Sequence, residues 1–205
     1  MRKNAFSNSV KFLWAYSSLL GIMHGIFQVL QGPVRPPAVI IQAIGSPCQP
    51  EMVWHACFPA ITVLPNMLIS GMLAIILSVA ILMGSLVQNN IQTKSWLYNL
   101  LFVSLLLVGG GFVPVFIGVI TGLAVILSNN RTSQNNAFGR LIAKLWPWPL
   151  LMMALWLPGS WLLGHYFSEA MLSFSVILFV YFDLGLPVLG LLSAYGFDAT
   201  RQGVD

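Results

Sequence analysis

The sequence predicts an all-α integral membrane protein, a polytopic helical bundle of about six membrane segments in a single domain covering residues 1–205. Two observations lead to this class. The chain is 58% hydrophobic and only 7% charged, whereas a soluble domain carries about 25% charged residues. Apolar runs close to the ~20 residues that cross a bilayer recur along it. These runs are continuous, unlike the alternating segments of an outer-membrane barrel.

The first membrane segment is expected over residues 12–30. It follows Arg2, Lys3 and Lys11, and positive charges beside a first segment predict a cytoplasmic N-terminus. The run is longer than the 7–15-residue core of a signal peptide. The letters "QVLQGPV" follow it in place of a small-x-small cleavage site. We therefore expect a retained helix.

Residues 31–59 are rich in Pro, Gly and polar side chains and are expected to form an external loop. Its stretch "AVIIQAIG" predicts a short helix lying in the membrane interface. Cys48 and Cys57 fall in this loop, where an oxidising environment favours a disulfide. Closing the loop between these two cysteines would stabilise the fold by roughly 2.5–3 kcal/mol in the chain-entropy model. A dithiol that exchanges with partners, free thiols and metal ligation remain alternatives.

The second segment is expected over residues 60–87, and residues 96–127 come next. As one helix the latter would be about 48 Å long, too long for an ordinary crossing. Glycines and a proline break it in the middle: Gly109, Gly110, Gly111 and Pro114. Either one long broken helix or a hairpin of residues 96–109 and 113–128 fits. Positive charge favours the hairpin, because it keeps three basic residues cytoplasmic, namely Arg131, Arg140 and Lys144.

The last two segments are expected over residues 146–164 and 170–195, joined by a short external turn. Trp146 and Trp148 fit an aromatic belt on the cytoplasmic side, and Trp161 fits one on the outer side. Both termini are then cytoplasmic. The expected location is a bacterial-type plasma (inner) membrane.

A candidate intramembrane polar site consists of His24, Gln28 and Asp183. His24 and Gln28 share one helical face of the first segment, and Asp183 lies near the middle of the last. Polar side chains inside a membrane face protein or water, and an intramembrane carboxylate is a functional candidate. The partner of Asp183 could be His24, Tyr181 or a backbone amide of the hairpin. A structural hydrogen bond is the alternative role.

Small-x-x-x-small spacing lets membrane helices approach closely. The chain has two such pairs, Gly21 with Gly25 and Gly118 with Gly122. We expect both pairs to serve helix packing.

External metal or haem ligands are a weaker hypothesis, resting on His55, His165 and Glu51. No paired ligand motif accompanies them, and cysteines joined in a disulfide could not serve as thiolate ligands. The sequence therefore leaves the question of a cofactor open, with haem or a metal as the candidates.

The sequence contains no Walker loop, GxSxG, HExxH, dinucleotide fingerprint or EF-hand, which points away from an enzyme. Its net charge of +4 is scattered along the chain, which argues against nucleic-acid binding. The leading expectation is an accessory or structural subunit of a larger membrane complex, with other membrane proteins as partners. The alternatives are a small-solute or ion transporter, with or without proton coupling, and an outward-facing redox or haem-binding protein.

Overall fold

The computed structural model describes residues 4–42, 59–87, 91–92, 94–128 and 137–202. Their secondary structure is helical apart from one small ribbon of two strands. Three of the described helical stretches are long and apolar enough to cross a membrane: Ala5–Leu30, Met67–Val87 and Ser175–Arg201. This confirms the predicted class, a helical protein that integrates into a membrane. The number of crossings stays a prediction.

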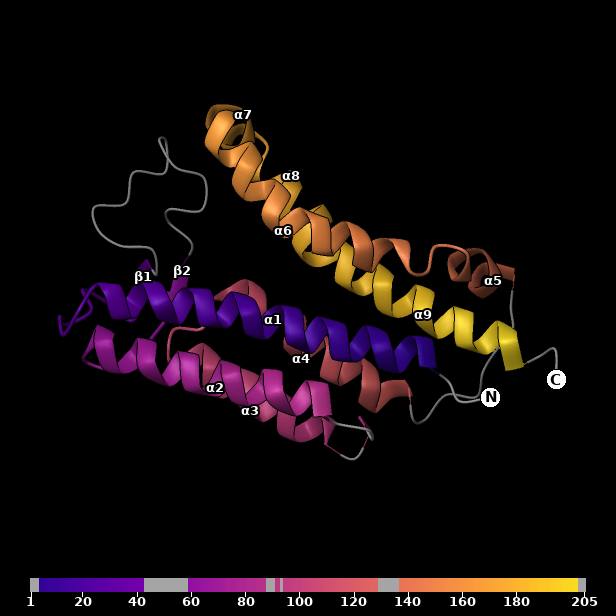
Figure 1. The fold of residues 1–205 in the computed structure, drawn as a ribbon, viewed down its shortest axis with the longest axis horizontal. Coiled ribbons are helices and arrows are strands. Elements are labelled where there is room, and N and C mark those ends of the chain that lie inside the picture. Colours follow the sequence, from indigo (N-terminus) through magenta and orange to yellow (C-terminus); the bar gives the residue numbers. More distant parts are fainter. Residues whose placement is uncertain (1–3, 43–58, 88–90, 93, 129–136, 203–205) are drawn as a thin grey trace.

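Four helices form a bundle along the long axis of the molecule (Figure 1), and we call them the bundle. They are α1 (Asn4–Leu30), α2 (Met67–Val87), α3 (Ser95–Leu107) and α4 (Phe112–Ser128). Helix α1 packs against α2, α4 and α9. Trp14 of α1 is fully buried; its ring stacks on Tyr98 of α3 with centroids 4.0 Å apart. Its indole N–H donates to the Gly118 carbonyl of α4 at 3.3 Å. One aromatic residue thus joins three helices.

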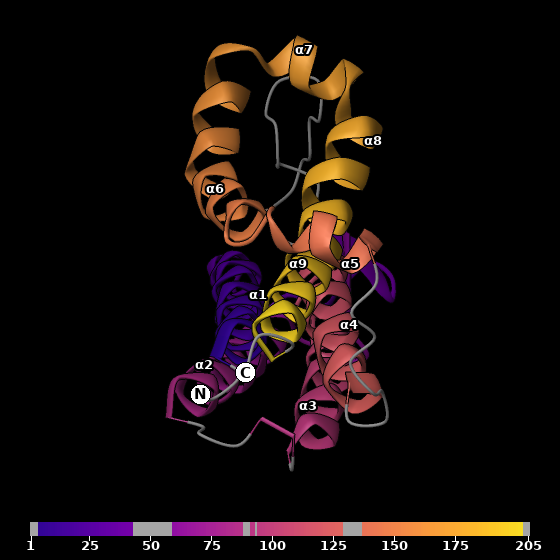
Figure 2. The same cartoon turned by 90° about the vertical axis from the view of Figure 1, so that its right-hand side faces the viewer.

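The remaining helices lie on the other side of α1. They are α5 (Ala137–Ala143), α6 (Trp148–Tyr166), α7 (Ser168–Ser173), α8 (Ser175–Leu178), the π-helix η1 (Phe179–Gly185) and α9 (Leu186–Gln202). Figure 2 shows α6, α7 and α8 as an arch that stands off from the bundle, while α9 runs beside α1. We call α6, α7, α8 and η1 the arm.

The prediction of a short interfacial helix at "AVIIQAIG" is wrong. Strand β1 (Ile40–Gln42) occupies its described part and pairs antiparallel with β2 (Pro59–Ile61). The β-branched pair Ile40 and Ile41 suits a strand better than a helix. Helix α2 accordingly begins at Met67, later than the expected second segment, because residues 59–61 serve the ribbon and Pro65 precedes the helix.

The last expected segment is not one uniform helix. A turn at Phe174 separates α7 from α8, and η1 replaces α-helix at Phe179–Gly185. At the end of η1 the Leu186 N–H donates to the Tyr181 carbonyl, five residues earlier. Pro187 has no N–H, so the Asp183 carbonyl cannot receive the usual i→i−4 bond. The proline thus favours the wider π-helical turn just before it.

Candidate functional site

The predicted intramembrane residues lie at two places in the structure, one at the break between α3 and α4 and one at Asp183. At the break, Gly109 and Gly111 have φ of +90° and +84°, a conformation that glycine adopts readily. The turn leaves backbone carbonyls at the end of α3 without partners in the helix. Groups from neighbouring segments donate hydrogen bonds to them. The Val63 N–H donates to Leu107 O at 3.0 Å, and Ser70 Oγ donates to Val108 O at 2.9 Å.

Gln28 of α1 completes this set, because its side-chain N–H donates to the Gly109 carbonyl. Since that carbonyl is an acceptor, Gln28 Nε2 must face it. Gln28 Oε1 is then left buried without a hydrogen-bond partner. Gln28 is fully buried, so this oxygen is an acceptor held in the apolar interior.

His24 lies one turn before Gln28 on the same face of α1 and packs against Gly111. A Cβ built on Gly111 would lie 2.5 Å from His24 Nε2 and 2.7 Å from Cε1, so the ring fills the space that a side chain there would need. His24 Nδ1 is also buried without a partner. Buried polar atoms normally have a protein or water partner. Two unpaired atoms on residues one helical turn apart therefore mark a place where a polar ligand or a proton can be held.

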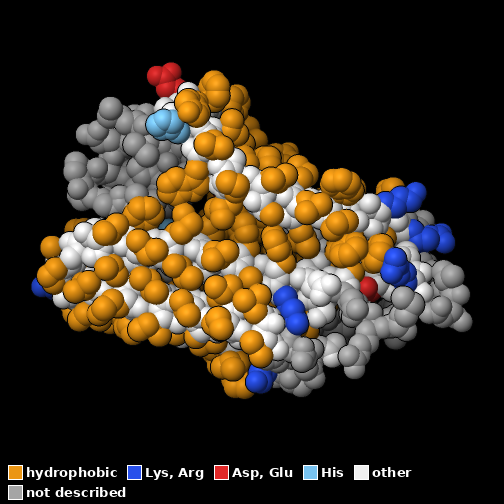
Figure 3. Space-filling model, in the orientation of Figure 1, with side chains coloured by type: hydrophobic (Ala, Val, Ile, Leu, Met, Phe, Trp, Pro, Cys, Tyr) orange, Lys and Arg blue, Asp and Glu red, His pale blue; other side chains and the backbone are white. Residues whose placement is uncertain are grey.

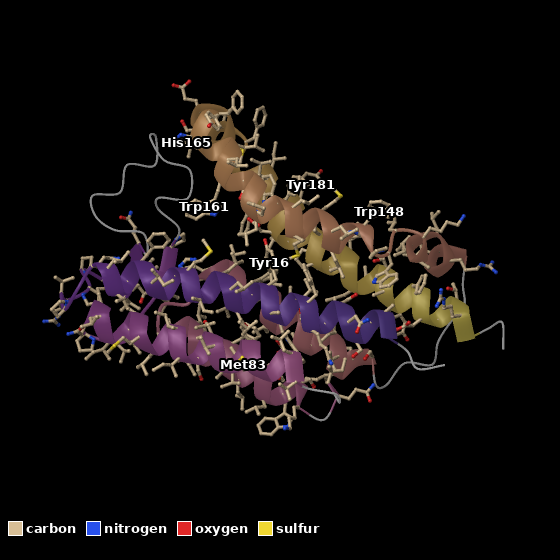
Figure 4. The ribbon with its side chains drawn as sticks, in the orientation of Figure 1. Tyr16, Met83, Trp148, Trp161, His165 and Tyr181 are labelled. Carbon is tan, nitrogen blue, oxygen red and sulfur yellow. The ribbon has the colours of Figure 1, made fainter. Side chains whose placement is uncertain are left out.

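Asp183 occupies η1, which packs against α4 of the bundle. The indole N–H of Trp156, on α6, donates to its carboxylate. The Trp156 ring also stacks on Phe182 with centroids 4.0 Å apart. Tyr16 of α1 is buried and lies within electrostatic range of the carboxylate. Figure 4 labels Tyr16 between α1 and the helices of the arm. In the described part of the chain, no Lys, Arg or His pairs with Asp183.

The structure separates the three candidate residues of the intramembrane site. His24 and Gln28 meet the backbone at the break between α3 and α4, whereas the interactions described for Asp183 are with Trp156 and Tyr16 and do not include His24. Tyr16 precedes His24 by eight residues, which corresponds to about 12 Å along a helix. Tyr181 is 67% exposed and is not among the described partners of Asp183 either.

The predicted packing glycines all lie at close contacts between helices. Gly25 faces the backbone of Gly71 on α2, and Gly21 faces Ser78 of the same helix. On α4, Gly118 lies against the Phe102 ring, and Gly122 lies against Asn99 of α3.

Several other predicted residues lie outside the described part of the chain: Cys48, Cys57, His55 and Glu51. The disulfide therefore stays a prediction. His165 is exposed near the end of α6, edge-on to Tyr166. Across the residues that the structure does describe, no three His, Cys, Asp or Glu side chains come together as a metal site. The haem hypothesis stays a prediction.

Sequence reasoning missed three residues of these sites. Gly71 has a detectable signal, because Ser70, Ala74 and Ser78 repeat small side chains along the same helix. Trp156 has a weaker signal. Tryptophan usually lies at the membrane interface, whereas Trp156 lies in the middle of a predicted segment. Tyr16 has none, because its importance depends on which helix lies beside α1.

Comparison of the chain with protein-family models, with curated proteins and with solved structures found no match.

Proposed function

We propose that this protein is a small-solute or ion transporter driven by protonation of Asp183. The observation that supports this most is the carboxylate without a basic partner in the described structure, at the junction of arm and bundle. A charged carboxylate in an apolar interior is costly unless it is paired. A proton or a cationic ligand can neutralise it, and transporters use intramembrane acids in this way.

The π-helix around Asp183 supports the same proposal. Single π-turns inside α-helices are frequent at functional sites, and η1 joins the exposed helix α8 to the packed helix α9. Protonation would weaken the bond that Asp183 accepts from the Trp156 indole. Both residues belong to the arm, so this change acts on the contact between η1 and α6.

The unpaired atoms of His24 and Gln28 provide a second polar site in the bundle. Broken helices in transporters place free backbone groups and polar side chains around their ligand. We infer that this site receives the polar solute or ion and that Asp183 carries the proton.

The proposal includes the topology of six crossings with cytoplasmic termini in a bacterial-type inner membrane. Two observations support it. The start of α1 and the end of α9 lie at the same end of the long axis (Figure 1). Gly118 and Gly122 of α4 lie against Phe102 and Asn99 of α3, and the chain from Tyr98, beside Gly84, to Val108, beside Ser70, extends along α2; both contacts favour a hairpin.

Proton flux into proteoliposomes tests the proposal directly. A pH-sensitive dye enclosed in the vesicles reports acidification after a membrane potential that is negative inside is imposed. We expect wild-type protein to acidify the interior and Asp183→Asn to abolish the flux, with Asp183→Glu retaining part of it. His165→Gln, at an exposed histidine, is the matched control. A folded Asp183→Asn variant with wild-type flux, or wild-type protein without flux, would contradict proton coupling.

The accessory-subunit function is the second candidate, favoured by the exposed arm. Large apolar side chains of the arm are exposed on both α6 and its return helices: Leu155 71%, Leu162 63%, Val176 73% and Tyr181 67%. Such a surface can pack against another membrane protein. Purification from native membranes in mild detergent should then yield a stoichiometric partner. Recovery as a lone monomer would count against this candidate.

A further inference from the structure

The segment from α5 through the turns at 144–147 to the start of α6 exposes apolar side chains to its surroundings. Its exposed apolar residues follow each other at three- and four-residue steps: Phe138 69%, Leu141 63%, Leu145 42% and Trp148 64%. A short helix with an apolar side, next to membrane-spanning helices, lies in the interface with that side among the acyl chains.

Basic side chains accompany this apolar side. Arg140 and Lys144 are exposed and one helical turn apart, and Arg201 is exposed at the end of α9, which packs against α5. Figure 3 shows Lys and Arg side chains gathered at this end of the molecule. Asp198 is the one acidic residue described on α9 near this cluster. Both its oxygens already accept backbone N–H groups, from Ala5 at 3.2 Å and Phe6 at 2.9 Å.

Aromatic packing fixes the position of Arg201. Its guanidinium lies 4.5 Å above the Phe197 ring, and the Phe197 and Trp146 centroids are 4.6 Å apart. The Trp146 indole donates to Ser9 Oγ at 3.2 Å, which ties the cluster to α1. Stacking on a ring face leaves the edges of a guanidinium free, and those edges match the geometry of a phosphate.

Helices α5 and α9 pack closely against each other. A Cβ built on Gly196 would lie 2.7 Å from the Gly139 carbonyl, so the two helices cross without an intervening side chain. Arg140 of α5, and Lys144 in the turn directly after α5, thus belong to the segment that packs against α9, which carries Arg201.

We propose that Arg140, Lys144 and Arg201 form a binding site for the headgroup of an anionic phospholipid, with Phe138, Leu141 and Trp148 against its acyl chains. Charge complementarity selects this occupant. The site combines three cations with exposed apolar side chains, and its nearby acid, Asp198, is already bonded to the start of α1. Basic clusters between membrane helices bind anionic headgroups in this way.

Quenching of tryptophan fluorescence by brominated lipids tests the site in the full-length protein in mixed micelles. Wild-type protein should bind brominated phosphatidylglycerol more tightly than brominated phosphatidylcholine. Each charge near a membrane surface contributes about fivefold in affinity, so Arg140→Gln, Lys144→Gln and Arg201→Gln together should remove a preference of roughly 100-fold. Lys94→Gln removes an exposed charge outside the cluster and should leave the preference unchanged.

A charge-preserving variant, with Arg140→Lys and Lys144→Arg, should keep the preference and shows whether folding alone explains a loss. Equal binding of the two lipids by wild-type protein would overturn the proposal whatever the variants do. So would a triple variant that still prefers phosphatidylglycerol, or a preference that Lys94→Gln abolishes equally.

Discussion

At the scale of the residue, Gly32 and Gly111 both have a left-handed φ but differ in their surroundings. Gly32 has φ +79° and nothing within 4 Å of the position of a Cβ. Gly111 has a similar φ, yet the His24 ring occupies that position. A side chain would therefore strain the backbone at both sites, but it would overlap a neighbouring side chain only at Gly111.

Gly111→Ala should therefore destabilise the protein more than Gly32→Ala. Left-handed φ costs a non-glycine residue roughly 1–2 kcal/mol, and the overlap with His24 adds to this at Gly111. Thermal unfolding in detergent measures the difference. Gly159→Ala, in α6 with open space around it, should be neutral. Adding His24→Ala should restore part of the loss, and equal effects at Gly32 and Gly111 would contradict the contact.

Gln28 illustrates what a sequence reveals about one residue. Its helical face was predictable from spacing alone, and so was a break at Gly109–Gly111. The hydrogen bond between them depends on how α1 lies against the break between α3 and α4, which no local pattern encodes. The same holds for Asp183, whose position in the last segment was predictable, whereas its contact with Trp156 required the path of the arm.

Gln28→Leu should destabilise the protein by about 1–3 kcal/mol, because it leaves the buried Gly109 carbonyl without its donor. The leucine keeps the apolar volume, so packing loss contributes little. Ser173→Ala, which removes an exposed hydroxyl bonded to Glu169 O, should change stability by less than about 0.5 kcal/mol. Denaturant unfolding in micelles provides the measurement. A Gln28→Leu variant as stable as wild type would show that the carbonyl has another partner.

At the scale of the element, the beginning of α1 depends on the end of α9. The first N–H groups of a helix lack intrahelical partners, and the Asp198 carboxylate accepts two of them, from Ala5 and Phe6. A negative charge at this position also favours the helix dipole. The cap comes from a residue 192 positions away in sequence, so the two terminal helices stabilise one another.

Asp198→Ala should cost about 1 kcal/mol, the usual effect of removing a helix cap. Hydrogen exchange of the amides of Ala5 and Phe6 should accelerate, and Asp198→Asn, which keeps one acceptor, should lie between the variant and wild type. Glu169→Ala, at an exposed acid of α7, is the control. Unchanged exchange at Ala5 and Phe6 would rule out the cap.

Elements were predictable to different degrees for physical reasons. Long apolar runs identify the helices of the bundle, because only a helix satisfies its backbone within one segment in lipid. The ribbon of Ile40–Gln42 and Pro59–Ile61 escaped prediction, since a three-residue strand is too short for a periodic pattern. The π-helix escaped as well, although Gly185 and Pro187 indicated a loosened helix there.

At the scale of the whole molecule, the direction of the hairpin determines the topology. If α3 and α4 turn back at Gly109–Gly111, Lys94 before α3 and Lys144 after α4 lie on the same side of the membrane. If residues 95–128 cross once, the two lysines lie on opposite sides. The arrangement of helices in Figure 1 and the positive charges both favour the first topology, which also gives the proposed transporter an even number of crossings.

Cysteine accessibility distinguishes these topologies. In a background with Cys48→Ser and Cys57→Ser, single Lys94→Cys and Lys144→Cys variants should react with a membrane-impermeant maleimide from the same side. Arg35→Cys, in the exposed segment after α1, should react from the other side. The reason is that α1 and α2 each cross once, whereas the hairpin returns the chain to the side it left. Labelling of Lys144→Cys from the side of Arg35→Cys would exclude the hairpin and move the basic cluster of α5 to the outer surface.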